Sequence, residues 1–167
     1  PVKRVMHGGG INGFSTMLVH MPEEEYTIVV FDNTQGPSGQ VADGLSRILY
    51  DQPAPMPKQS IGNRMGKIIT EKGFEAAEEE YNKLKENQPD AFDFSEPELN
   101  ILGYYYLGEG EVETAIKVLK LNSELFPEAF NTYDSLGEAY REAGNIELAI
   151  KNYKKSLELN PGNEAAR

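Results

Sequence analysis

Two consecutive stretches of 34 residues decide the fold of this chain: EPELNILGYYYLGEGEVETAIKVLKLNSELFPEA at 96–129 and FNTYDSLGEAYREAGNIELAIKNYKKSLELNPGN at 130–163. Laid over one another, they place the same residue types in register: Leu102-Gly103 with Leu136-Gly137, Tyr106 with Tyr140, Gly110 with Gly144, Ala115-Ile116 with Ala149-Ile150, Leu125 with Leu159 and Pro127 with Pro161. The small residues let two helices approach closely, and the large ones fill the space beside them. The second shared glycine suits a turn, and the proline ends a helix. Each stretch is therefore predicted to be a helix-turn-helix unit.

This pattern resembles the tetratricopeptide repeat, a helix-turn-helix unit of 34 residues that stacks into an α-α superhelix. A less regular copy precedes the other two and carries Ile61, Met65, Ile68, Gly73, Ala77, Tyr81, Leu84 and Pro89, with four residues, Ala91 to Phe94, inserted after it. We expect three repeats, at about 58–91, 96–129 and 130–163, which is about the minimum that buries a continuous core. Only four residues follow the third repeat, so its apolar end face is expected to stay open and to favour self-association.

Composition excludes several classes of function. The 167 residues carry a formal net charge of −11, which disfavours nucleic-acid binding, because tracking phosphates requires clustered Lys and Arg. We expect a basic or neutral partner instead. No apolar run approaches the roughly 18 to 20 residues of a membrane span, and the absence of cysteine excludes disulfides, thiolate zinc sites and a cysteine nucleophile. Since the first residue is Pro1 rather than methionine, we expect a trimmed or excised chain.

Residues 1–57 form a different domain from residues 58–167. Two runs rich in β-branched and aromatic residues, 14–21 and 26–32, flank the polar Pro22–Glu25 and predict a β-hairpin. A helix is expected near 40–50, and the proline-rich stretch 51–57 is expected to be a stiff linker. Both faces of the hairpin are apolar, whereas one helix covers only one face. The fold class predicted for the whole chain is mainly α, with a small hairpin and helix at its start.

The string Met-His-Gly-Gly-Gly-Ile-Asn-Gly-Phe at 6–14 is the only chemically suggestive motif of this first domain. It lacks the spacing of a phosphate-binding loop. Together with the hairpin, the helix and the proline-rich exit, it resembles the end of the serine β-lactamase and penicillin-binding-protein family. The resemblance implies that 1–57 are the remnant of a β-lactamase-like α/β domain. His7, Gly8 and Gly9 would then occupy the K-T-G position, where His7 hydrogen-bonds near the substrate and the glycines let it lie along the strand edge.

The family's catalytic elements are missing from this sequence. No serine is followed three residues later by lysine, and no Tyr-x-Asn or Ser-x-Asn is present. Without nucleophile and base, we expect no hydrolase activity from this chain alone. The alternative is that it is the functional portion of a serine hydrolase of β-lactamase, DD-peptidase or esterase type whose nucleophile lies upstream. His7 and His20 lack a spaced third ligand, so we expect no metal and no cofactor. The resemblance implies a bacterial, periplasmic or extracytoplasmic location, and leaves the cytoplasm open.

The tetratricopeptide resemblance also implies a peptide-binding groove lined by side chains of the first helix of each repeat. Seven positions would line it: Asn100, Tyr104, Leu107, Asn131, Asp134, Glu138 and Arg141. Such a surface suits an extended basic or polar segment of a partner protein. The seven positions do not reproduce the Lys/Asn/Arg arrangement with which some tetratricopeptide domains hold a terminal carboxylate. Two alternatives stay open: the repeats pack against the hydrolase domain, or two copies form a homodimer through the exposed hairpin or the open end of the repeats.

Overall fold

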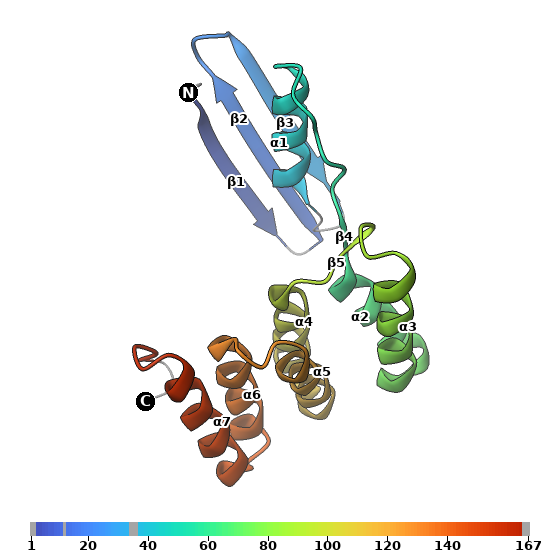
Figure 1. Cartoon of the computed structure of the whole chain (residues 1–167), viewed down its shortest axis with the longest axis vertical. Coiled ribbons are helices and arrows are strands. Elements are labelled where there is room, and N and C mark those ends of the chain that lie inside the picture. Colours follow the sequence, from blue (N-terminus) through green and yellow to red (C-terminus); the bar gives the residue numbers. More distant parts are fainter. Residues whose placement is uncertain (1–2, 12, 34–36, 165–167) are drawn as a thin grey trace. The chain divides into compact units, whose positions relative to one another are not determined.

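The computed structural model describes residues 3–11, 13–33 and 37–164, and the chain divides into two compact units, Pro1–Gln59 and Ser60–Arg167. The fold is mainly α, as predicted, with a small sheet in the first unit and helix pairs in the second (Figure 1).

The first unit is an antiparallel sheet with one helix packed on it. The predicted hairpin is confirmed as β2 (Phe14–Met21) and β3 (Tyr26–Asp32), and a further strand, β1 (Val5–Ile11), extends it to the order β1-β2-β3. Gly13, at φ +85°, follows β1, and Ile11 pairs with Phe14 across the turn. Helix α1 (Ser38–Ile48) contacts β2 and β3. It begins two residues before the expected start at Gln40.

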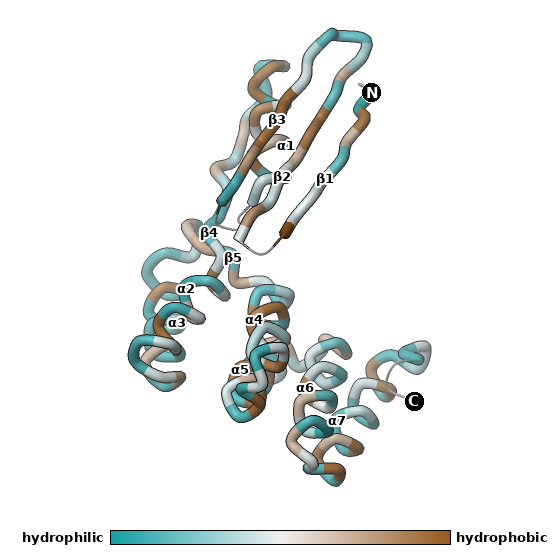
Figure 2. Tube along the Cα trace, turned by 180° about the vertical axis from the view of Figure 1, so that it is seen from behind, coloured by the Kyte–Doolittle hydropathy of each residue, from teal (hydrophilic) through white to brown (hydrophobic). Residues whose placement is uncertain are grey.

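One face of this sheet is covered and the other is open. Val19 and Met21 of β2 are buried, as is Ala42 of α1, whereas Leu18 is exposed and His20 is half-buried. The opposite face is rich in exposed apolar side chains, which include Ile11, Phe14, Leu18, Val29 and Phe31. Figure 2 shows hydrophobic residues spread along these strands. The expectation that one helix covers only one apolar face is therefore confirmed. The proline-rich stretch passes close to α1, since a Cβ added to Gly44 would lie 3.9 Å from Ala54 Cβ.

The second unit consists of three helix pairs in sequence order (Figure 1). The pairs are α2 (Ile61–Lys72) with α3 (Phe74–Asn87), α4 (Glu96–Gly108) with α5 (Val112–Leu125), and α6 (Phe130–Glu142) with α7 (Ile146–Leu159). Two short strands, β4 (Gln59–Ser60) and β5 (Phe92–Asp93), pair with one another. The predicted helix-turn-helix units are thus confirmed.

Turn glycines and polar caps define the helix ends. Gly110 and Gly144 have φ of +76° and +75°, which L-residues with a Cβ rarely adopt, so the glycine of each turn is required by its conformation. Ser60 Oγ accepts a hydrogen bond from the Asn63 N–H at 3.0 Å at the start of α2, and Asn145 Oδ1 accepts one from the Leu148 N–H at 3.2 Å at the start of α7. The turn of the first pair is shorter, because Gly73 alone joins its two helices.

The core is continuous across the junction between the first two pairs. Met65, Tyr81, Leu99 and Val118 are almost completely buried in one cluster. The inserted stretch Ala91–Phe94 joins this cluster, and the ring of Phe94 meets that of Tyr81 edge-on with centroids 5.2 Å apart. A second cluster, Leu119 with Leu136 and Ala139, holds α6 against α5. The insertion therefore fills the core of the first repeats.

The closest helix approach predicts a destabilising substitution. A Cβ added to Gly103 on α4 would collide with Cγ and Cδ2 of Leu119, which is fully buried on α5. We expect Gly103→Ala to lower the free energy of unfolding by about 1–3 kcal/mol, as overpacking of a core does. Urea unfolding measures the change. The matched control is Gly108→Ala at the end of the same helix, where a Cβ would meet nothing within 4 Å. Equal stability of the two variants would contradict the prediction.

Candidate functional site

The first helices of the three pairs lie side by side and are joined by hydrogen bonds between helices. Tyr106 Oη on α4 donates to the Gly66 carbonyl on α2 at 3.3 Å. Tyr104 Oη donates to Glu138 Oε2 on α6 at 2.7 Å, and Asn131 Nδ2 donates to Glu96 Oε1 at 3.0 Å. These bonds fix α6 against α4. The exposed side chains of α4 and α6 therefore make one surface, which we call the first-helix surface.

The seven predicted groove residues differ in burial and in their hydrogen-bond partners. Leu107 is half-buried and packs against the two core clusters. Asn100 is half-buried, and its Oδ1 is buried without a hydrogen-bond partner among the described residues. Asn131 and Asp134 are half-buried and already bonded, Asp134 Oδ1 accepting from Asn163 Nδ2 at 3.0 Å. The remaining three, Tyr104, Glu138 and Arg141, come together.

Tyr104, Glu138 and Arg141 form a polar cluster on the first-helix surface. Glu138 accepts from Tyr104 through Oε2 and pairs with Arg141 Nη2 through Oε1 at 3.3 Å. Arg141 Nη2 also lies 3.2 Å from Glu142 Oε1. Because Arg141 is shared between two carboxylates and Asp134 lies on the same helix, the α6 part of the surface carries excess negative charge. It can accept a cationic group.

The phenol of Tyr104 is held in its protonated form. Burial, together with the neighbouring carboxylates of Glu138 and Asp134, raises the pKa of Tyr104 to about 12. A protonated phenol remains a hydrogen-bond donor, which is the role that Glu138 requires of it. The pair is therefore a fixed feature of the surface at neutral pH.

Two exposed residues of this surface were missed by the sequence analysis. Ile101 is 66% exposed and Tyr105 is 58% exposed, and with Tyr104 they stand three and four residues apart on one side of α4. We call these three residues the α4 stripe. The sequence carries one signal for these exposed residues: from Ile101 to Leu107 the residues are almost all apolar or aromatic, so apolar side chains lie on every side of α4. A helix of that kind at a protein surface exposes apolar side chains.

The residues of the other proposed site lie in the first unit. His7, Gly8 and Gly9 are all exposed on β1, an edge strand of its sheet. Gly9 faces Thr16, whose Oγ1 donates to the Gly9 carbonyl at 3.4 Å. Within the described ranges, no group of three His, Asp or Glu side chains is placed to hold a metal ion. No described helix is long and apolar enough to cross a membrane.

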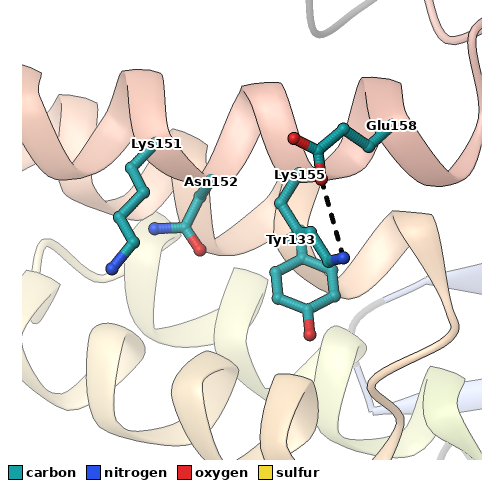
Figure 3. A pocket seen from close by; sticks show the side chains of 5 residues that line it. All are labelled: Tyr133, Lys151, Asn152, Lys155 and Glu158. Atoms are coloured by element: carbon teal, nitrogen blue, oxygen red, sulfur yellow. Dashed lines mark ion pairs between the residues drawn. The ribbon is translucent and has the colours of Figure 1, made fainter.

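A shallow hollow of about 380 Å³ lies on the last helix pair (Figure 3). It is lined by Tyr133, Lys151, Asn152, Lys155 and Glu158, and most of the surface that these side chains present to it is apolar. Lys155 Nζ and Glu158 Oε2 are 3.6 Å apart, so half of its positive charge is already compensated within the helix. Tyr133 and Asn152 of this lining occupy the positions that Leu99 and Val118 occupy one repeat earlier. Leu99 and Val118 are buried.

Part of the second unit is similar to a known repeat family. Residues 135–163 match the family model described as tetratricopeptide repeat. Over 59 residues, 35% of this chain, the sequence is 41% identical to Superkiller complex protein 3 of Homo sapiens and 37% identical to that of Mus musculus. The chain spans about 4% of the length of each of these curated relatives. Residues 135–163, which include most of the last helix pair, are thus similar to a tetratricopeptide repeat, as the sequence pattern predicted.

Solved structures were compared as well. The N-terminal domain of stress-induced protein-1 (STI-1) from C. elegans is 17% identical, with a TM-score of 0.41, over 65% of this chain and 93% of that one. MamA AMB-1 is 16% identical, with a TM-score of 0.43, over 77% of this chain and 68% of that one.

The raised pKa of Tyr104 predicts a pH effect. A phenol whose folded-state pKa lies above its ordinary value of 10.0 stabilises the fold fully below pH 10, and that stabilisation is lost as pH rises to about 12. In ¹³C NMR of ring-labelled tyrosines, the signal that disappears in Tyr104→Phe should titrate near 12. In Glu138→Gln its midpoint should fall, because the charge that opposes ionisation is gone. A Tyr104 signal that titrates near 10 in the unsubstituted protein would count against the described cluster.

Proposed function

We propose that the second unit is a protein-interaction module that binds an extended peptide segment on the first-helix surface. The observation that carries the proposal is the α4 stripe, in which three large apolar or aromatic side chains stand exposed beside a hydrogen-bonded acidic cluster. Exposed apolar groups next to ordered polar groups are typical of recognition surfaces, because the first supply affinity and the second supply orientation.

The chemistry of the surface favours a partner that is both apolar and basic. An apolar side chain of the partner would cover Ile101 and Tyr105, which are too exposed to contribute to the core. A lysine or arginine nearby would pair with Glu138 or Glu142, which share a single arginine. The net charge of −11 attracts such a segment at long range. A terminal carboxylate would be repelled, so the partner is bound through its side chains.

Binding of a fluorescent peptide tests this proposal. We expect a short peptide of alternating lysine and leucine to bind, and the same peptide with glutamate in place of lysine not to bind. Ile101→Asp and Glu138→Lys should each weaken binding about tenfold, or about 1.4 kcal/mol, and added salt should weaken it further. Fluorescence anisotropy gives the affinities.

The matched control is Glu113→Lys, which makes the same charge change at an exposed position of α5, outside the first-helix surface. Equal loss of affinity in Glu113→Lys and Glu138→Lys would show that only the overall charge matters. Unchanged affinity in Ile101→Asp would remove the α4 stripe from the binding surface.

We also propose that the first unit is the closing part of a β-lactamase-like serine hydrolase, with its nucleophile upstream and with its site in the bacterial envelope. Two observations favour this function. The His-Gly-Gly string lies on an exposed edge strand, and two further antiparallel strands and a helix follow it in the order that the resemblance implies. The open apolar face of the sheet is of the kind that another layer of a larger domain covers.

This second proposal predicts that the chain alone has no acyl-transfer activity, because it holds His7 without a nucleophile and base. Purified protein should neither hydrolyse nitrocefin nor become labelled by a fluorescent penicillin. Heat-denatured protein sets the background for both assays. Turnover or labelling above that background would contradict the prediction. A reading frame that encodes S-x-x-K upstream of Pro1 would support the hydrolase origin, and a start codon directly before Pro1 would refute it.

A further inference from the structure

The internal repeat shows what normally covers the second helix of a pair. Helix α7 occupies the place that α5 occupies one repeat earlier. On α5, Leu119 is fully buried against Leu136 and Ala139 of α6, and Ile116 packs on the same cluster. The equivalent positions on α7 are Tyr153 and Ile150. The face of α5 that the next helix buries therefore recurs on α7. Among the described residues, no helix follows α7 to bury it.

This face of α7 forms a regular apolar stripe, made of Ile146, Ile150, Tyr153 and Leu157. The spacing of four, three and four residues keeps all of them on one side of the helix, as in the seam of a coiled coil. Ile146 is 56% exposed and Ile150 is 49% exposed. We call these four residues the α7 stripe.

The two margins of the α7 stripe differ. One margin consists of Ala149 and Ser156, which are buried within the repeat itself. The other carries Glu147 near the start of the helix and Lys154 seven residues later, both exposed. Neither belongs to any ion pair found among the described residues. The stripe therefore has one free margin, with opposite charges toward its two ends.

We propose that the α7 stripe is an interface between two copies of this chain, packed antiparallel about a two-fold axis perpendicular to α7. Such an axis brings the same margin of both helices together and reverses their direction. Glu147 of each copy then lies beside Lys154 of the other, which gives two equivalent ion pairs. In the seam, Ile146 meets Leu157 and Ile150 meets Tyr153. A parallel arrangement would place the charged margin against the buried one and form neither pair.

The area of one helix face per copy sets the expected strength. An interface of this kind lies at the small end of specific association, and we expect it to dissociate in the micromolar range. Sedimentation velocity across the micromolar to millimolar range should therefore show a monomer that converts to a dimer. Far-UV circular dichroism confirms that each variant is folded.

The first test is removal of the apolar contact. Ile150→Asp should abolish the dimer, because it places a carboxylate in the seam. The matched control, Ile48→Asp, changes an isoleucine that is 60% exposed on α1 and should leave the dimer intact. If the unsubstituted chain stays a monomer at every concentration, the proposal is overturned, even if another molecule covers the stripe. Equal loss of the dimer in both variants would overturn it as well.

The second test addresses the antiparallel register. Glu147→Lys and Lys154→Glu should each weaken the dimer about tenfold, because each places like charges together in both pairs. The double variant carries both changes in every copy and recreates two opposite-charge pairs. It should therefore restore the original dissociation constant. A double variant weaker than either single variant would overturn the antiparallel pairing.

Discussion

The close approach of two helices at one glycine is the constraint on which the second and third helix pairs depend. Gly103 lies against Leu119, and a Cβ added to Gly137 would lie 2.8 Å from Tyr153 Cδ1. Because α4 turns by about 100° per residue, a glycine that faces α5 directs the next residue, Tyr104, away from the pair. There it reaches Glu138 of the following repeat. The contact that closes each pair thus also determines which side chains are left for the first-helix surface.

Most of the helical unit could be predicted from the sequence, because each special residue has one local role. The turns at Gly110 and Gly144 and the core position of Tyr106 follow from a pattern that occurs twice in register. Strand β1 had no such signal: three successive glycines have low β-propensity, and the strand forms through its pairing with β2. Only the resemblance placed a strand there.

The candidate site could be predicted in part. The groove positions implied by the family resemblance included Tyr104 and Glu138. The hydrogen bond between them depends on the packing of one repeat on the next. The same positions included Leu107, which is half-buried and packs against both core clusters. Ile101 and Tyr105 were missed because an apolar residue in an amphipathic pattern is assigned to the interior. In α4 the apolar residues encircle the helix, and the packing of α2, α5 and α6 on it decides which of them stay exposed.

The two later repeats differ from the first in a way that bears on how the array can change length. They share the same turn and the same glycine contact, so a gene duplication that copies residues 130–163 would reproduce both features in the new repeat. The first repeat has a single-residue turn at Gly73 and core rings supplied by its insertion. Copied into the middle of the array, it would interrupt the stacking. An array that lengthened by duplicating its second or third repeat would therefore keep the same turn and the same contact between helices.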